Sequence, residues 1–192
     1  MRICVYAGSS MGSRPEYRAA AAALGELLAA EGIGLVYGGG SVGLMGTLAN
    51  AVLAKGGEVI GVIPEALHAV GVAHDGLSEL RVVATMHERK AAMAELSSAF
   101  IALPGGIGTL DEVFEAWTWS QLGVHAKPIA CLNTCGFYDK LTAFLDRVVA
   151  EDFLKPVHRD VLIVEEDPAK LLAAVCRAKI PFVPKWKGLE KA

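Results

Sequence analysis

Short apolar runs and longer amphipathic stretches alternate along most of the chain. The apolar runs, many of them bounded by glycine or proline, predict buried strands at 3–7, 33–37, 58–63, 80–83, 99–103, 128–132 and 161–164. The stretches between them predict helices that end near 31, 55, 98, 122, 152 and 179, with a short helix and an irregular linker in 65–79. This order predicts an α/β fold, a Rossmann-like doubly wound parallel sheet of about seven strands with helices on both faces.

Some of the helices are expected to begin with a capping box, a serine or threonine followed three residues later by a glutamate. The candidate pairs are Ser13 with Glu16, Thr85 with Glu88 and Thr109 with Glu112. In this motif the hydroxyl accepts a backbone N–H bond, and the glutamate accepts the N–H of the capping residue. Glu112 therefore has a structural explanation beside any chemical one. A Glu112→Gln substitution separates the two, because glutamine still caps but carries no charge.

The length of 192 residues suits one domain, which we place at 1–180, followed by a C-terminal tail at 181–192. Hydrophobic residues make up 53% of the chain and the mean hydropathy is +0.41, which is high for a soluble monomer. Surplus apolar surface commonly becomes a subunit interface, so we expect a homodimer. The net charge of −3, without a basic stripe, argues against nucleic acid as a partner.

Cysteine and histidine spacing bears on compartment and metal binding. The four cysteines form no CxxC pair and are too scattered for a disulfide framework or a zinc site, which favours a cytoplasmic location. The five histidines lack metal-ligand spacing, so no metal is expected. The uncharged stretch 32–54 is long enough for a membrane span. Its glycines divide it into a strand, a turn and a helix, so no membrane association is expected.

The segment AFIALPGGIGTLDE at 99–112 is the strongest candidate for a ligand site. An apolar strand leads into a proline-glycine turn and then into a helix. Glycine lets the backbone approach a ligand closely, and the free amides of a helix N-terminus attract phosphate. The residues expected around a phosphate are Gly105, Gly106, Ile107, Gly108 and Thr109. Asp111 and Glu112 are expected in the first turn, which would place carboxylates beside the phosphate.

A second candidate signal is the pair Arg89 and Lys90, expected in the second turn of the helix that Thr85 caps. Cations are mildly disfavoured near the positive end of a helix dipole, so an anion in front of them would explain their placement. Arginine is the stronger candidate, because its planar fork binds phosphate or carboxylate through two bonds. The structural alternative is two solvated helix residues. Glu115, one turn beyond Glu112, could pair with it and raise one pKa.

The glycines at 38, 40 and 43 match the spacing of the dinucleotide-binding fingerprint. They follow the second strand, however, and no acidic residue ends the next strand, as that fingerprint requires. A loop facing phosphate or ribose, or simple helix-sheet packing, explains them better than nicotinamide or flavin binding. The P-loop motif is absent, which excludes a P-loop NTPase.

Several segments together resemble a known family. YGGGSVGLMG at 37–46, MHERK at 86–90 and PGGIGTLDE at 104–112 are similar to motifs of the LONELY GUY (LOG) family of cytokinin-activating phosphoribohydrolases. The segment WSQLGVHAKP at 119–128 also resembles this family, and the resemblance extends from residue 3 to about residue 164. Many members were once labelled lysine decarboxylases, a name that the motifs do not support.

The resemblance implies a Rossmann-like dimer that hydrolyses the N-glycosidic bond of a nucleoside 5'-monophosphate, with no cofactor or metal. It implies two catalytic residues, Arg89 and Glu112, and a substrate-binding set, Lys90, Gly105, Gly106, Ile107, Gly108, Thr109, Asp111 and Thr118. The residues agree with this chemistry, because a carboxylate near C1' can stabilise an oxocarbenium-like transition state and orient water. One departure is Gly71, where members often carry an acid.

Other functions fit the same fold. A pyridoxal-phosphate decarboxylase would need a lysine that forms a Schiff base with the cofactor. A non-catalytic carrier of a nucleotide or of a pterin cofactor would bind phosphate without breaking a bond. Loss of both Arg89 and Glu112 would favour a carrier, and both residues are present.

Overall fold

The computed structural model describes residues 1–181 and 183, so nearly all of the predicted tail lies outside the described residues. Seven strands form one sheet, in the order β4-β3-β2-β1-β5-β6-β7, and every neighbouring pair is parallel. The strands are β1 (Arg2–Tyr6), β2 (Gly34–Tyr37), β3 (Val59–Pro64), β4 (Glu79–Val83), β5 (Ala99–Ala102), β6 (Ile129–Leu132) and β7 (Leu162–Glu165). The predicted doubly wound parallel sheet is confirmed.

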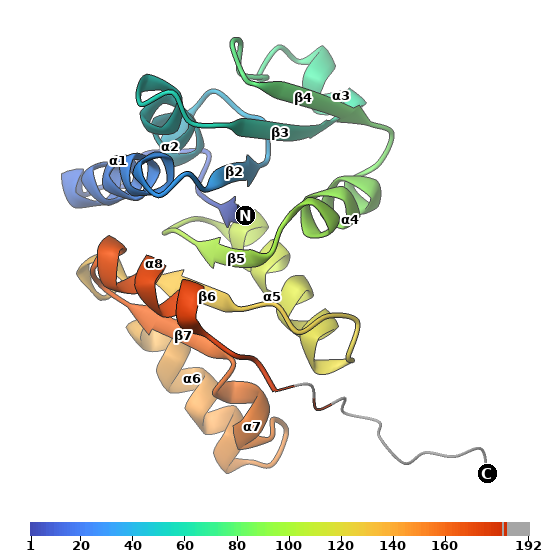
Figure 1. Cartoon of the computed structure of the whole chain (residues 1–192). Helices are drawn as coiled ribbons and strands as arrows, with labels where there is room; N and C mark the ends of the chain where they lie inside the picture. Colours follow the sequence, from blue (N-terminus) through green and yellow to red (C-terminus); the bar gives the residue numbers. More distant parts are fainter. Residues whose placement is uncertain (182, 184–192) are drawn as a thin grey trace.

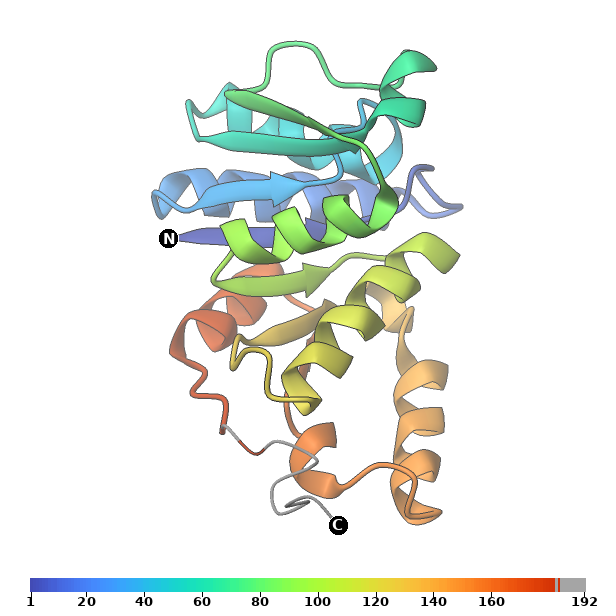
Figure 2. The same ribbon diagram turned by 90° about the vertical axis from the view of Figure 1, so that its right-hand side faces the viewer.

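Helices cover both faces of the sheet (Figure 1). One face carries α1 (Pro15–Ala30), α2 (Gly43–Ala54) and α8 (Pro168–Arg177), and the other carries α4 (Met86–Leu96), α5 (Ile107–Gln121) and α6 (Asp139–Ala150). Figure 2 shows α4 and α5 side by side in front of the strands. The short helices α3 (Glu65–Ala69) and α7 (Pro156–Arg159) and the 3-10 turn η1 (Thr134–Gly136) lie in connections. Of these three, only α3 was predicted from the sequence.

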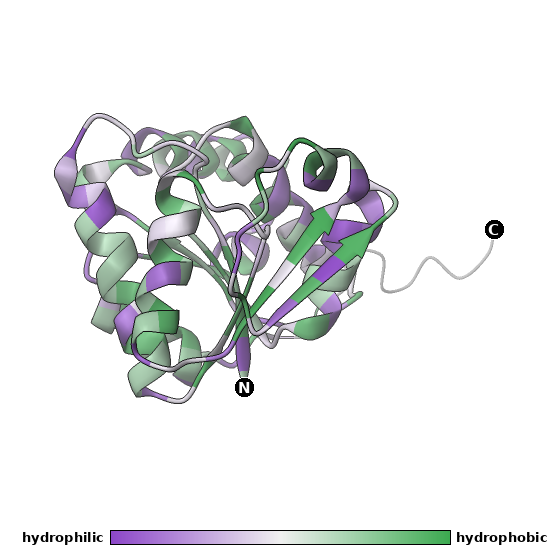
Figure 3. Cartoon of the chain, turned by 90° about the horizontal axis from the view of Figure 1, so that it is seen from above, coloured by the Kyte–Doolittle hydropathy of each residue, from purple (hydrophilic) through white to green (hydrophobic). Residues whose placement is uncertain are grey.

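The core divides into two layers because side chains alternate across the sheet. In β1, Ile3 and Val5 pack in the layer with α1 and α2, whereas Cys4 and Tyr6 pack in the layer with α4 and α5. Burial on both faces explains why the central strands are continuously apolar. The edge strand β4, nearest the viewer in Figure 3, instead includes the hydrophilic residues Glu79 and Arg81, and none of its residues is fully buried. None of the described helices combines the length and apolarity needed to cross a membrane.

The strand order reverses between β1 and β5, which lie side by side although 96 residues separate their paired positions Ile3 and Ala99. In open α/β sheets, ligands bind beyond the carboxyl ends of the strands at such a switch point. The loops that begin at Ala7 and at Leu103 are therefore the expected walls of a binding site. Gly8 N–H donates to the Pro104 carbonyl at 3.2 Å, which joins these two loops directly.

The predicted helix starts were right in one case and wrong in two. Thr85 caps α4, since its Oγ1 accepts the Glu88 N–H at 3.1 Å, although the Glu88 carboxylate accepts from the N–H of Ala84. The predicted cap by Ser13 is wrong, because α1 begins at Pro15. Proline fixes φ near the helical value and has no N–H to satisfy, so it starts a helix without a side-chain cap. The start of α5 also differs from the prediction, because the helix begins at Ile107 and Thr109 does not cap it.

Candidate active site

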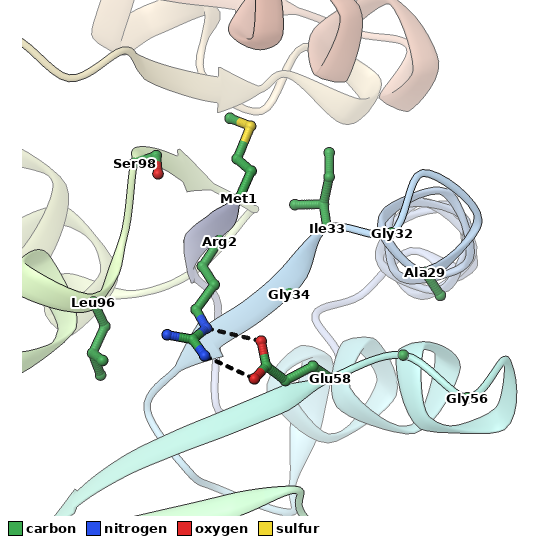
Figure 4. Close-up of a pocket in the computed structure, with 11 residues that line it drawn as sticks. Met1, Arg2, Ala29, Gly32, Ile33, Gly34, Gly56, Glu58, Leu96 and Ser98 are labelled. Atoms are coloured by element: carbon green, nitrogen blue, oxygen red, sulfur yellow. Dashed lines mark hydrogen bonds and ion pairs between the residues drawn. The ribbon is translucent and has the colours of Figure 1, made fainter.

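A cleft of about 320 Å³ opens at the carboxyl edge of the sheet, between the ends of β1 and β5. Its lining comes from the loops after β1 and β2, from α4 and from the first turns of α5. A larger depression of about 510 Å³ lies at the opposite, amino edge (Figure 4). The charged side chains there, Arg2 and Glu58, are 39% and 44% exposed, whereas Arg89 and Glu112, which line the smaller cleft, are only 9% and 11% exposed. We therefore place the candidate active site in the smaller cleft.

Arg89 reaches the cleft from α4 and is held from several sides. Its side chain is only 9% exposed, and its Nη1 lies 3.2 Å from Glu112 Oε1. Nε donates a hydrogen bond to the Val62 carbonyl at 3.0 Å. Gly38, just after β2, leaves room for the guanidinium, because a Cβ at that position would collide with Nη2. The fold thus presents a fixed cation to the cleft, and the prediction that Arg89 faces a ligand site agrees with its position.

Glu112 lies in the second turn of α5, not in the first as predicted. The helix begins at Ile107, with Gly106 as its N-cap and no side-chain cap. Thr109 therefore does not cap α5, and the capping role predicted for Glu112 is wrong. Its carboxylate instead faces Arg89. Burial raises the pKa of Glu112, and the positive charge of Arg89 offsets this only in part. A raised pKa brings a carboxylate closer to the range useful for general base catalysis.

The N-terminus of α5 is open toward the cleft. In a helix with Gly106 as N-cap, the amides of Ile107, Gly108 and Thr109 have no intrahelical carbonyl partner, and the first such bond is from Leu110 N–H to Gly106 O at 3.2 Å. The backbone of Gly106 and Gly108 is exposed. Gly105 is required for packing, since a Cβ there would collide with the buried Thr109 side chain. The predicted phosphate loop thus lies at an uncapped helix end.

The N-terminus of α2, which also borders the cleft, is closed. The N–H groups of Leu44 and Met45 donate to the Gly8 carbonyl at 3.0 and 3.4 Å. Gly43 permits this close approach, because it has a φ of +62° and a Cβ there would meet the backbone of Ser9. The glycine-rich segment after β2 therefore serves mainly helix-loop packing and room for Arg89. An anion would find free amides at α5 rather than at α2.

Asp111 and Lys90 differ in their relation to the cleft. Asp111 lines it and has a side chain that is 58% exposed. Lys90 does not line it, and its Nζ lies 3.1 Å from both Asp111 Oδ2 and Glu115 Oε2. Burial alone would lower the pKa of Lys90, but the hydrogen bonds to these two carboxylates and their negative charges together outweigh it, so the net shift is upward. The lysine therefore faces protein carboxylates rather than the cavity.

Thr118 lies away from the cleft, in a second groove of about 170 Å³ between α5, α6 and the segment after α6. That groove is mostly apolar, and its lining includes Trp117 and Phe153. Trp117 is buried and donates from Nε1 to the His158 carbonyl at 2.9 Å. The described residues contain no group of three or more His, Cys, Asp or Glu suited to hold a metal ion.

An apolar wall, which was not predicted from the sequence, also lines the cleft. It consists of Met45, Ile63, Leu67, Val72 and Met86. Val72 belongs to the irregular linker, which is fixed to the loop after β2. Ser41 N–H donates to the Val72 carbonyl at 3.0 Å, and His74 N–H donates to Gly39 O at 2.9 Å.

Gly71 does not line the cleft. It has a φ of +79°, follows α3, and has open space where a Cβ would lie. A glycine is favoured at such a left-handed position after a helix. The departure from the family pattern at this position is therefore compatible with a linker that forms one wall of the cleft through its neighbour Val72.

The fold and the cleft define a class of protein: an α/β protein with an uncapped helix end and a buried arginine-glutamate pair at the switch point of its sheet. A protein-family model described as "Possible lysine decarboxylase" matches residues 45–175. The chain is 53% identical over 171 residues to a probable cytokinin riboside 5'-monophosphate phosphoribohydrolase of Oryza sativa subsp. japonica, covering 89% of this chain and 75% of that protein. It is 49% identical over 162 residues to a cytokinin riboside 5'-monophosphate phosphoribohydrolase of Arabidopsis thaliana, covering 84% and 75%. The chain belongs to the LOG family.

Solved structures with the same fold include carriers of a metal cofactor. A molybdenum cofactor carrier protein from Chlamydomonas reinhardtii is 25% identical, with a TM-score of 0.69 and coverage of 92% of this chain and 95% of that one. A molybdenum cofactor binding protein from Rippkaea orientalis is 24% identical, with a TM-score of 0.69 and coverage of 91% and 94%. These similarities establish the shared fold and leave the activity to be argued from the site.

Proposed function

We propose that this protein hydrolyses the N-glycosidic bond of cytokinin riboside 5'-monophosphates, and of AMP more weakly, to a free base and ribose 5-phosphate. The buried pair of Arg89 and Glu112 beside the uncapped start of α5 carries this proposal. Glu112 lies five residues beyond Ile107, about 7.5 Å along the helix axis. A phosphate at the helix end would therefore direct the sugar toward the carboxylate.

The proposed reaction needs no group outside the chain except water. The bond from C1' to the base nitrogen breaks with its electron pair going to the base, which leaves positive charge on C1' and the ring oxygen. Glu112, as a carboxylate, stabilises that charge and accepts a proton from the water whose oxygen bonds to C1'. The proton returns to the base nitrogen, so the balance is nucleotide plus water to base plus ribose 5-phosphate. Arg89 holds Glu112 and sugar or phosphate oxygens in place.

The apolar wall supports a cytokinin nucleotide over plain AMP. Leu67, Val72 and Met86 offer methyl and thioether groups without charge. An isoprenoid substituent on the base gains free energy by burial against such a surface, whereas the bare amino group of adenine loses water there. Both curated relatives described above are also named for cytokinin riboside 5'-monophosphate.

The carrier and the decarboxylase explain the cleft less well. A carrier needs an anion site but no buried carboxylate, whose negative charge near a phosphate would weaken binding. A pyridoxal-phosphate enzyme needs a lysine in its cleft, and the described residues that line this one include no lysine. The named relatives at about half identity are phosphoribohydrolases, whereas the carriers are related at a quarter identity.

The decisive experiment is product analysis. The full chain is incubated with isopentenyl-AMP and with AMP, and free base and ribose 5-phosphate are separated by chromatography. We expect both products in equal amounts, with a higher kcat/KM for isopentenyl-AMP. A protein that binds both nucleotides but releases no base would instead be a carrier.

We further propose a cytoplasmic homodimer. All four cysteines are free thiols, which suits a reducing compartment. Phe144 and Phe153 are 62% and 81% exposed, the latter beside the groove that contains Trp117. Exposed aromatic side chains of this size are typical of a subunit interface. Light scattering of the purified chain should give twice the mass of one chain, 20.2 kDa.

A further inference from the structure

Charged side chains of α4 and α5 form two separate sets of ion pairs beside the cleft. Three carboxylates on α5 face two cations on α4, and each cation has its own partners. Arg89 contacts Glu112, while Lys90 contacts Asp111 and Glu115, each at 3.1 Å. Arg89 and Lys90 are consecutive residues, as are Asp111 and Glu112, and only the Arg89–Glu112 pair lies wholly at the cleft.

The position of Lys90 does not fit the substrate-binding role that the family resemblance implies. Its side chain is 10% exposed, its ammonium is already bound to two carboxylates, and it does not line the cleft. A buried charge is stabilised only where partners replace its lost water. A phosphate in the cleft would have to compete with two protein carboxylates for this ammonium.

We propose that Lys90 is a positioning residue: it binds Asp111 and Glu115 so that α5 presents Glu112 to Arg89, and it screens Glu112 from two neighbouring negative charges. This inference rests on the proposed function for its meaning in catalysis. Lys90 affects the reaction through its effect on Glu112 and not by binding the phosphate. Without Lys90, only Arg89 would offset the negative charges of Asp111 and Glu115 at Glu112.

The surroundings of Glu112 fix the sign of the expected effects. From α4, Arg89 and Lys90 favour its ionised form, and from α5, Asp111 and Glu115 disfavour it. From β1, Cys4 and Tyr6 also interact with Glu112, but burial raises the pKa of both well above their ordinary values, so they are neutral near pH 7. Removing Lys90 must therefore raise the pKa of Glu112 further, and removing Glu115 must lower it.

The test is a set of pH profiles of kcat/KM for isopentenyl-AMP, because the acid limb of such a profile reports a base of the free enzyme. For Lys90→Met we expect the acid limb at higher pH. For Glu115→Gln, which alters a residue outside the cleft lining, we expect it at lower pH. Each unit of displacement changes the rate on the acid limb about tenfold. Lys90→Arg keeps the charge and should restore the wild-type limb.

Two further measurements keep the inference testable if Lys90→Met folds poorly or if the proposed function fails. The double variant Lys90→Met with Glu115→Gln removes one charge of each sign and should fold and return the limb toward wild type. Calorimetric titration with inorganic phosphate, which needs no turnover, should give Lys90→Met an affinity within about threefold of wild type. A tenfold or greater loss of phosphate affinity, or a raised KM with an unmoved acid limb, would make Lys90 a substrate ligand and overturn the inference. A wild-type chain that releases no base would overturn the proposed function alone.

Discussion

Two arginine-glutamate pairs lie near opposite ends of the same strand, β2, and they differ in almost every property except composition. At the amino edge, Arg2 and Glu58 form two hydrogen bonds of 2.8 Å, and their side chains are 39% and 44% exposed (Figure 4). At the carboxyl edge, Arg89 and Glu112 meet through one contact of 3.2 Å with 9% and 11% exposure.

Each pair depends on a glycine of or next to β2. A Cβ at Gly34, the first residue of the strand, would collide with Glu58, and a Cβ at Gly38, just after its last residue, would collide with Arg89. A glycine without a Cβ thus leaves room for a charged side chain at either end of the strand.

The pKa values of the two glutamates, Glu58 and Glu112, shift in opposite directions. Hydrogen bonding to Arg2 lowers the pKa of Glu58, whereas burial raises the pKa of Glu112 despite Arg89. In the exposed pair, Arg2 donates two hydrogen bonds to Glu58, and these bonds favour the ionised form of the glutamate. The buried pair holds a charge that its environment disfavours, which is useful in a base and costly for stability. Burial, and not the identity of the partners, therefore separates a structural ion pair from a candidate catalytic one.

Among substitutions in the two pairs, Glu112→Gln is expected to have the largest effect on activity. Glutamine keeps the size of the side chain and can still contact Arg89, but it cannot stabilise positive charge or accept a proton. We expect kcat for isopentenyl-AMP to fall by about 10² to 10⁴ with KM changed little. Steady-state kinetics with product analysis measure this, and Glu58→Gln serves as the matched control with wild-type kinetics. A Glu112→Gln protein as fast as wild type would remove Glu112 from the mechanism.

The next largest effect is expected for Gly38→Ala. The added methyl group should displace the Arg89 guanidinium, the flexible end of a side chain, so the fold should survive while Arg89 moves away from Glu112. We expect kcat/KM to fall about 100-fold. Gly34→Ala is the control, because it should displace Glu58 and leave kcat/KM within about twofold of wild type. Equal losses in both variants would mean that the two edges are not functionally distinct.

A smaller effect concerns stability and pH. Because the folded-state pKa of Glu112 is raised, its contribution to stability is full below its ordinary pKa of 4.5 and is lost as pH rises through the folded value. Relative to the Glu112→Gln variant, the free energy of unfolding of the wild type should therefore decrease as the pH rises through the folded-state pKa of Glu112. Urea unfolding from pH 4 to pH 8 measures the difference. A gap that stays constant over this range would show that burial does not perturb Glu112.

The smallest effect is expected for Glu58→Gln. The folded-state pKa of Glu58 is lowered, so its contribution is present above 4.5 and is lost as pH falls through the folded value. Because the pair is exposed, we expect the thermal midpoint at pH 7 to fall by only about 2 °C. The deficit should be smaller at pH 3 than at pH 7. An equal deficit at both pH values would point to lost packing instead of lost charge.

The sheet could be predicted from the sequence because each strand is a short apolar run buried on both faces, as in β1 and β5. The start of α5 could not be predicted in the same way. Thr109 and Glu112 have the spacing of a capping box, yet the helix begins two residues before Thr109, at Ile107. A helix end that binds an anion must leave its amides uncapped, so rules based on caps fail at this kind of site.

The candidate site was predictable only in part. The predicted phosphate loop and Arg89 meet as expected, because motifs at the ends of neighbouring strands share one edge of the sheet. The partners of Lys90 depend on how α4 packs against α5, which no local pattern encodes. The apolar wall depends on the linker, where Val72 is held by backbone bonds to Ser41 that carry no sequence signal.

Helix α4 is also the connection by which the chain returns from the sheet edge at β4 to its centre at β5. Strands β1 to β4 are neighbours in chain order, so a nascent chain can assemble them from local contacts before β5 leaves the ribosome. Arg89 therefore belongs to the part of the chain that emerges first, and Glu112 to the part that follows. The contact between them joins the two halves of the sheet, so the buried pair can form only after β5 and α5 have docked.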